Sequence, residues 1–104
     1  MYTIIETPTY SSKVSKILTE DERETLAVYL SINPRADSIV RGTGGVRKLR
    51  WALRGRDKSG GARITYFNRL AYGEVWLLTI YAKGGRKNIP AWELKLIKEA
   101  IDRD

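Results

Sequence analysis

The amino-acid sequence predicts one α+β domain spanning residues 1–104, with its helices packed on one face of a sheet. Two observations support this fold class. Apolar residues recur at helical spacing near both ends of the chain, whereas residues 46–82 show the alternation and the glycine-bounded runs of strands. The expected elements are, in chain order, a strand at 2–6, helices at 8–18 and 19–32, an antiparallel three-stranded meander at 46–53, 62–67 and 74–82, and a C-terminal helix from residue 90.

The two N-terminal helices are expected from local signals. Pro8 suits the first turn of a helix, where its missing N–H is not needed. Thr19 and Glu22 form a capping box, in which the threonine hydroxyl accepts the N–H of residue 22 while the carboxylate reaches back. Asn33 and Pro34 then stop the second helix. The neighbouring acidic residues suit the helix dipole, so capping accounts for them and no metal site is predicted.

The first strand of the meander separates an apolar side from a charged side. Leu49 and Trp51 point one way, and Lys48 and Arg50 point the other way. If the helices cover the apolar side, the two cations lie on an open face of the sheet. Arg63, on the next strand, can join them there.

The final helix is expected to start at Pro90. Four residues are expected to face inward from it: Trp92, Leu96, Ala100 and Ile101.

The positive charge of the chain is concentrated in one segment. The whole sequence has 19 Lys+Arg and 12 Asp+Glu, a net charge of +7. Residues 41–63 hold eight basic residues and one acid, which equals the entire excess, whereas residues 1–40 have a net charge of −2. Clustered cations favour a polyanionic partner, because binding releases counterions from phosphates. Tyr66 and Tyr81 lie on neighbouring strands, at positions that favour core packing over base stacking.

Cysteine and histidine are both absent from the sequence. Their absence excludes disulfides, Cys/His zinc sites, thiol nucleophiles and triads that use imidazole. Any catalysis therefore depends on Lys, Arg, Tyr, Ser/Thr or carboxylates. The start of the sequence lacks the pattern of a signal peptide, and no apolar run approaches the roughly 20 residues of a membrane helix, so we expect a cytoplasmic protein with no membrane partner.

The glycine cluster Gly42-Thr43-Gly44-Gly45 is interpreted as a tight entry into the sheet. A phosphate-binding P-loop follows a strand, precedes a helix and ends in Gly-Lys-Ser/Thr, and this cluster does none of these. Nucleotide hydrolysis is therefore not expected.

Three sequence blocks carry a family resemblance: GTGGVRKLR at 42–50, GARITY at 61–66 and LTIYAK at 78–83. With the order of elements, they resemble the RelE/ParE superfamily of toxins from type II toxin–antitoxin systems, and most closely the HigB-like toxins. The resemblance implies a RelE-like fold and an mRNA interferase, a ribosome-dependent endoribonuclease without cofactor that inhibits translation. It also implies three partners: the ribosome, mRNA and a cognate antitoxin.

The resemblance also implies a set of catalytic cations. Lys48 and Arg50 match the paired cations of the first meander strand, Arg63 matches the arginine of the second, and Lys83 matches the cation that ends the third. Such enzymes often place a catalytic tyrosine near the C-terminus, whereas no tyrosine follows Tyr81 here, so the general acid is left open. Further cations are expected to bind the RNA backbone: Arg47, Arg54, Arg56, Lys58, Arg86 and Lys87.

The chemistry of RNA cleavage assigns roles to these cations. RNA carries its own nucleophile, the 2′-OH, so the protein must supply a proton acceptor, charge stabilisation and a proton donor. Arginine stays protonated and suits bidentate phosphate binding instead of base catalysis. A lysine among cations gives up its proton more readily, because like charges disfavour its charged form. We therefore take Lys48 as the base and Arg63 as the phosphate ligand, with Lys83 or Lys87 stabilising charge or donating the proton.

Two other functions are compatible with the sequence. ParE-like members of the superfamily inhibit DNA gyrase, although Lys48, Arg50 and Arg63 together favour an RNase. A non-catalytic module that binds RNA or the ribosome would need only the basic segment. Either residues 47–63 or the apolar helix surfaces would serve as the docking surface of an antitoxin.

Overall fold

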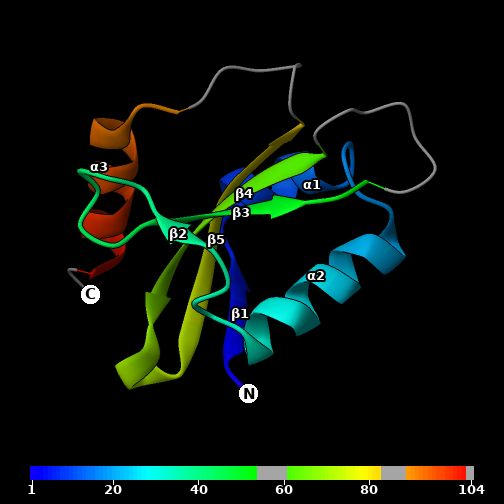
Figure 1. Ribbon diagram of the computed structural model, residues 1–104, viewed down its shortest axis with the longest axis horizontal. Coiled ribbons are helices and arrows are strands. Elements are labelled where there is room, and N and C mark those ends of the chain that lie inside the picture. The colour runs from blue at the N-terminus through cyan, green and yellow to red at the C-terminus, as the bar shows by residue number, and fades with distance from the viewer. Residues whose placement is uncertain (54–60, 83–88, 103–104) are drawn as a thin grey trace.

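The structure is a computed structural model and describes residues 1–53, 61–82 and 89–102. Its centre is a five-stranded sheet in the order β1-β5-β4-β3-β2 (Figure 1). The elements are β1 (Thr3–Glu6), α1 (Pro8–Val14), α2 (Glu20–Ile32), β2 (Ser38–Ile39), β3 (Arg47–Trp51), β4 (Ala62–Arg69), the 3-10 turn η1 (Leu70–Tyr72), β5 (Glu74–Ala82) and α3 (Ala91–Asp102). The predicted α+β fold class is confirmed.

The sheet consists of the predicted meander and two edge strands. β3, β4 and β5 pair antiparallel, and β5 has the predicted limits. β1 lies parallel beside β5, from Thr3 opposite Glu74 to Glu6 opposite Leu77. β2 pairs with β3 through two residues only, which is too short to produce an alternating pattern in the sequence.

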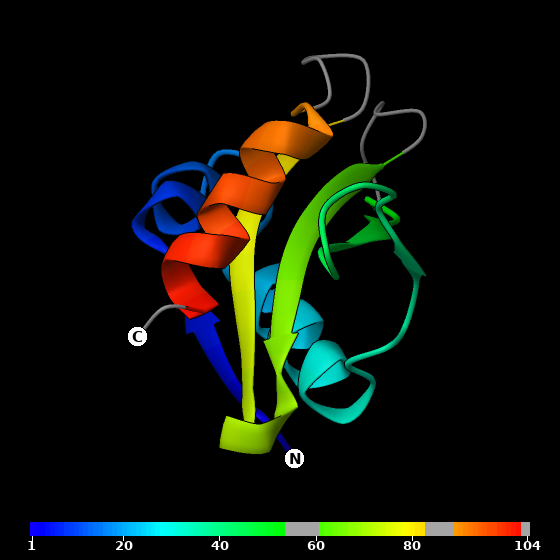
Figure 2. The same cartoon turned by 90° about the vertical axis from the view of Figure 1, so that its left-hand side faces the viewer.

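The helices cover both faces of the sheet, so the prediction that they share one face is wrong. α1 and α2 pack on one face of the sheet, where Tyr10 of α1 and Leu26 and Leu30 of α2 are buried in the core. α3 packs on the other face, where its Leu94 joins Leu78 of β5. Figure 2 shows α3 on the opposite side of the sheet from α1 and α2. The physical reason is that β5 is apolar on both sides, and a strand of this kind needs cover on both faces.

α3 presents a different side to the sheet from the one predicted. Leu94 and Ile101 are buried, whereas Trp92 is 64% exposed and Leu96 is 57% exposed. Ala100 is exposed as well, so of the four residues predicted to face inward only Ile101 does so. The side of α3 that faces the sheet carries Leu94, Ile97 and Ile101. Their spacing fits one side of a helix as well as the spacing of the predicted residues does.

The N-terminal helices agree with their local signals. α1 ends at Val14, earlier than the expected residue 18, although Leu18 stays in the core and its N–H donates to the carbonyl of Val14 at 2.8 Å. The capping box of α2 is present: Glu22 N–H donates to the Thr19 hydroxyl at 3.1 Å, and Thr19 N–H donates to the Glu22 carboxylate at 2.9 Å. Within the described part of the chain, no helix has both the length and the apolar character needed to cross a membrane.

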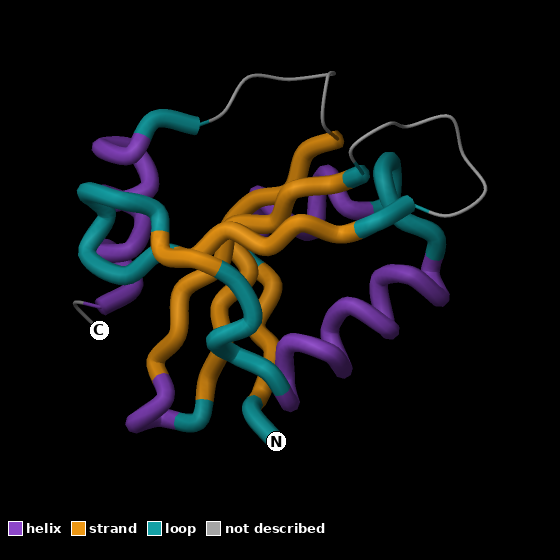
Figure 3. The backbone as a smooth tube through the Cα atoms, in the orientation of Figure 1, coloured by secondary structure: helices purple, strands orange, loops and turns teal. Residues whose placement is uncertain are grey.

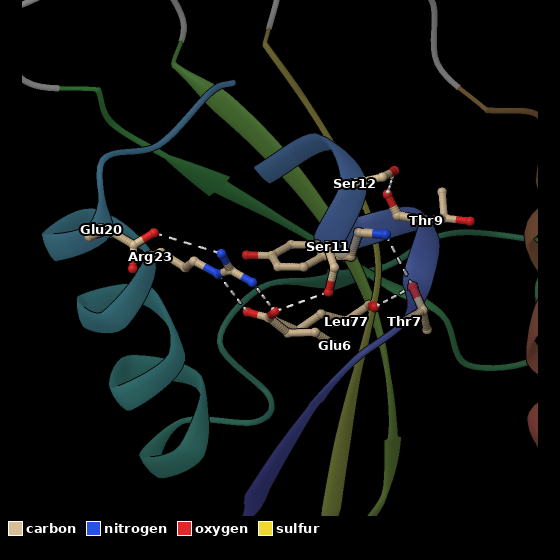
Figure 4. Close-up of polar contacts among 9 residues, drawn as sticks. Glu6, Thr7, Thr9, Ser11, Ser12, Glu20, Arg23 and Leu77 are labelled. Atoms are coloured by element: carbon tan, nitrogen blue, oxygen red, sulfur yellow. Dashed lines mark hydrogen bonds and ion pairs between the residues drawn. The ribbon is translucent and has the colours of Figure 1, made fainter. Parts of the chain in front are cut away.

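A polar cluster joins β1 to α2. The Arg23 guanidinium binds the Glu6 carboxylate through two N–H groups, one of them Nε at 3.0 Å from Oε2, and the Ser11 hydroxyl donates to the same carboxylate at 3.2 Å (Figure 4). The hydrogen bond from Arg23 lowers the pKa of Glu6 from its usual 4.5, although partial burial opposes this shift. The pair holds α2 against the first strand.

β5 contains a bulge opposite β4. Thr65 pairs with Thr79 and Tyr66 pairs with Leu77, so Leu78 is the extra residue. The Thr7 hydroxyl, which caps α1, lies 2.9 Å from the carbonyl oxygen of Leu77 (Figure 4). It also lies 3.0 Å from the carbonyl oxygen of Leu78. The bulge is therefore fixed by the residue that starts the first helix.

The long connection from α2 to β3 ends in a glycine turn (Figure 3). Gly42, Gly44 and Gly45 all have positive φ angles, which side chains disfavour. Between them, the Thr43 hydroxyl donates to the carbonyl of Val40 at 2.7 Å and accepts the N–H of Val46 at 3.0 Å. The predicted tight entry into the sheet is confirmed, and it fixes where β3 begins.

Candidate nucleic-acid interface

The register of β3 and β4 brings together three of the four predicted catalytic cations. Arg50 lies directly opposite Arg63, and Lys48 lies two residues further along, opposite Thr65. Residues opposite one another have Cβ atoms about 5 Å apart, and alternate residues share a face. Lys48, Arg50 and Arg63 therefore converge on one face of the sheet. We call this surface, with Thr65, Thr79 and Tyr81, the cation face.

The three cations differ in their exposure to solvent. Arg50 is exposed and Lys48 is half-buried, whereas Arg63 is only 9% exposed. The expectation of a fully open face is therefore wrong for Arg63. One Arg63 N–H donates to the carbonyl of Ala62 at 3.3 Å. Phosphate oxygens are strong acceptors whose geometry matches that of a guanidinium.

Hydroxyl groups extend the cation face across β4 and β5. Thr65 and Thr79 are buried, and their side-chain oxygens form a hydrogen bond of 2.6 Å. Tyr81 lies directly opposite Arg63 and is 7% exposed. The threonine pair was not predicted from the sequence. Thr65 and Thr79 are polar residues in otherwise apolar strands, and each lies two positions from Arg63 or Tyr81. Alternation along a strand could therefore have placed them on the same face as Arg63 and Tyr81.

Arg47 lies on the opposite face of β3. Its guanidinium donates a hydrogen bond to the carbonyl of Asp37, and it lies across from the buried Tyr66. Burial raises the pKa of the Tyr66 hydroxyl, and the charge of Arg47 partly offsets that shift. The structure therefore places Arg47 on the other face of β3 from Lys48 and Arg50.

Asp37 supports the β3 end of the cation face and was not singled out in the sequence. Its carboxylate accepts the backbone N–H of Arg50 at 3.3 Å and that of Ser38 at 2.8 Å. The contact with Arg50 spans 13 residues of sequence, so no local pattern could have revealed it.

The remaining predicted cations lie outside the described residues; they are Arg54, Arg56, Lys58, Lys83, Arg86 and Lys87. The strand ends that flank these segments in the sequence form one row across the sheet, with Trp51 opposite Ala62 and Ala62 opposite Ala82. This row is next to the one that holds Arg50, Arg63 and Tyr81.

Comparison with known proteins identifies the fold. No protein-family model matches the sequence. A free E. coli RelE toxin, an arginine-to-alanine double mutant, superposes with a TM-score of 0.61 at 19% identity, over 93% of this chain and 96% of that chain. The isolated E. coli RelE toxin also gives 0.61, at 20% identity, over 99% of this chain and 98% of that chain. The predicted RelE-like fold is therefore confirmed over nearly the whole chain.

Proposed function

We propose, on the premise of this RelE-like fold, that the chain is the toxin of a toxin–antitoxin pair and a HigB-like mRNA interferase. It would cleave mRNA on the ribosome in the cytoplasm, without metal or cofactor, and a cognate antitoxin would neutralise it. The observation that carries the proposal is the direct opposition of Arg50 and Arg63, with Lys48 on the same face. Cations on adjacent strands can contact a single phosphodiester from two sides.

The proposed reaction uses the 2′-OH of the substrate as the nucleophile. Lys48 accepts the 2′-OH proton, a bond forms between O2′ and phosphorus, and the bond between phosphorus and O5′ breaks. Arg63 binds the nonbridging oxygens as negative charge builds up on them, and the exposed Arg50 holds the incoming strand. The products are a 2′,3′-cyclic phosphate and a 5′-OH.

The leaving 5′-oxygen needs a proton, and we propose that Lys83 or Lys87 supplies it or stabilises its charge. Both residues lie outside the described part of the chain. The same applies to the proposed backbone-binding residues Arg54, Arg56, Lys58 and Arg86. Arg47 points away from this path, and we leave it out of the proposed RNA contacts.

Dependence on the ribosome follows from the composition of the site. Lysine, arginine and hydroxyl groups are weak acid–base catalysts at neutral pH, so the rate depends on accurate alignment of the 2′-oxygen with phosphorus. Accurate alignment of the reacting groups increases the rate of such a reaction by several powers of ten. A ribosome that holds the mRNA in one geometry would supply it.

The test is induced expression with mapping of mRNA 5′ ends. Wild type is expected to arrest growth and to produce cuts in phase with codons. Lys48→Ala and Arg63→Ala are each expected to lose about 100-fold or more of the cleavage rate. Lys95→Ala is the matched control, because Lys95 is an exposed cation on α3 and lies outside the cation face.

Arg63 is buried, so its variant also needs a check of folding by circular dichroism, and Arg50→Ala tests the same face at an exposed position. If folded Lys48 and Arg63 variants still arrest growth at matched expression, the proposed site is wrong. Growth arrest with intact mRNA and a supercoiling defect would indicate gyrase as the target. RNA or ribosome binding without cuts would indicate a non-catalytic module.

A further inference from the structure

The solvent side of α2 carries a stripe with exposed apolar residues towards its C-terminal end, and no described element covers it. Residues 21, 25, 28 and 32 follow the alternating spacing of four and three that places them on one side of a helix. Val28 is 45% exposed and Ile32 is 59% exposed, and Tyr29 beside them is 37% exposed. The opposite side of the helix is buried in the core. Figure 1 shows α2 at the periphery of the molecule. We call the exposed stripe the α2 seam.

Two hollows flank the centre of the α2 seam. The first lies at the N-terminal end and is lined by Asp21, Glu22, Thr25, Trp51 and Ala52. The second lies at the C-terminal end and is lined by Tyr29, Asn33, Pro34, Arg35 and Ala36. The rings of Tyr29 and Trp51 meet between them with centroids 5.5 Å apart.

The charges at the two ends of the seam are opposite. Acidic residues occupy the first turn of α2, and Asp21 lines the first hollow. Arg35 lies at the second hollow and is exposed. Among the residues that the structure describes, neither Asp21 nor Arg35 takes part in an ion pair.

From this arrangement we propose that a second copy of the chain docks on the α2 seam, forming a twofold dimer through antiparallel α2 helices. A twofold interface must be complementary to itself, and this one is. With the axis near Val28 and Tyr29, Thr25 of one copy faces Ile32 of the other. The same rotation brings Arg35 of the second copy to the hollow that Asp21 and Trp51 line.

The first hollow suits an arginine side chain in particular. A guanidinium binds a carboxylate through paired N–H groups and also stacks on the face of a tryptophan ring. The carboxylates of the first turn disfavour RNA at this surface, because they repel phosphates. α2 and the cation face lie on opposite faces of the sheet, so the dimer leaves both cation faces accessible.

The oligomeric state tests the proposal. One pair of helices buries less than the roughly 1,200 Å² of a standard interface, so the dimer is expected to dissociate on dilution. Sedimentation velocity of the purified chain from about 5 to about 300 µM is expected to show a monomer–dimer equilibrium. A chain that stays monomeric throughout overturns the proposal.

A matched pair of apolar variants locates the interface. Ile32→Glu is expected to weaken the dimer at least tenfold, because it places a carboxylate in the seam. Leu96→Glu is the control, since Leu96 of α3 is 57% exposed and Ile32 is 59% exposed. Equal effects of the two substitutions, or no effect of Ile32→Glu, would remove α2 from the interface. Melting curves confirm that both variants fold.

Exchanging the charges of Asp21 and Arg35 distinguishes this dimer from binding of another partner to the α2 seam. Asp21→Arg and Arg35→Asp alone are each expected to weaken association about tenfold, because each puts like charges together across the axis. The double variant is expected to return to within about threefold of wild type, since both pairs are then reversed. Failure of the double variant to recover overturns the pairing. A monomer that binds a different protein or RNA through α2 would contradict the second copy as occupant.

Discussion

Glu6 provides a residue-level test of how α2 is attached to the sheet. Arg23 holds the pKa of Glu6 below its usual 4.5, so the folded state favours the carboxylate more than the unfolded chain does. The stabilisation is complete well above pH 4.5 and is lost as the pH falls through the lowered pKa of the folded state. At pH 7 we expect Glu6→Gln to lower the free energy of unfolding by about 1 kcal/mol.

The measurement is urea unfolding of both proteins at several pH values. The difference in unfolding free energy between the two proteins is expected to shrink as the pH falls below the pKa of a free carboxyl group, because the Glu6 carboxylate of wild type is then protonated and loses its charge. Glu24→Gln, at an exposed position on α2, is the control and is expected to change stability by less than about 0.5 kcal/mol. A difference that does not depend on pH would mean that Glu6 stabilises by packing alone.

Thr7 acts at two places through one hydroxyl group. It caps α1 by accepting the N–H of Tyr10 at 3.3 Å, and it contacts the carbonyl oxygens of Leu77 and Leu78. Thr7→Val keeps the shape and removes these bonds, so we expect a loss of about 1 to 3 kcal/mol in the free energy of unfolding. Ser12→Ala is the control, because Ser12 is exposed and bonds only within its own helix turn. Equal losses would show that the bulge does not depend on Thr7.

Arg50 and Arg63 place two positive charges opposite each other on adjacent strands. Like charges directly opposite each other destabilise a sheet, and these two face each other in register. We therefore expect Arg50→Gln to raise the melting temperature slightly in buffer of low salt without phosphate, by the equivalent of about 0.2 to 1 kcal/mol. Added phosphate should stabilise wild type more than the variant. A variant that melts below wild type in the absence of phosphate would contradict this account of the site.

At the scale of elements, α3 offers two leucines with opposite environments. Leu94 is 1% exposed and packs on the sheet, whereas Leu96 is 57% exposed. Leu94→Ala is expected to cost about 2 to 4 kcal/mol of unfolding free energy, because it removes buried methyl groups and leaves a cavity. Leu96→Ala is expected to change it by less than about 0.5 kcal/mol. Denaturant unfolding of both variants measures the difference, and equal losses would contradict the orientation of α3.

The elements that the sequence predicted well are those with strong local signals. The capping box fixed the start of α2, and the apolar run of residues 74–82 fixed β5. The side of α3 could not be chosen, since two stripes with nearly equal apolar content compete and only the shape of the sheet decides between them. β2 was missed because two residues carry no period.

The candidate site divides in the same way. Alternation placed Lys48 and Arg50 on one face correctly, because that pattern lies within a single strand. The opposition of Arg50 and Arg63 depends on the register between two separate strands, and the burial of Arg63 depends on tertiary packing. Neither the register nor the burial can be predicted from the spacing of residues within one strand. The contact of Asp37 with Arg50 has the same long-range origin.

At the scale of the whole molecule, charge is divided between two sides. The cation face lies on one side of the sheet, and the acidic first turn of α2 packs on the other side. RNA affinity is therefore expected to fall with salt, and Arg50→Gln should reduce the slope of log K against log salt by about 0.7, the value for one contact with a single strand. Arg35→Gln, on the α2 side, should leave the slope unchanged. Fluorescence titrations of a short RNA at several salt concentrations compare the two, and equal slopes would show that RNA does not follow the cation face.

The extra residue in β5 has a consequence for how this architecture can diversify. Removing Leu78 would leave regular pairing, with Thr79 and Tyr81 still opposite Thr65 and Arg63. Leu78 thus behaves as an insertion that gives α3 an apolar contact without moving Thr79 or Tyr81 out of register with Thr65 and Arg63. The helix over that part of the sheet can therefore be reshaped while Arg50, Arg63 and Tyr81 keep their register.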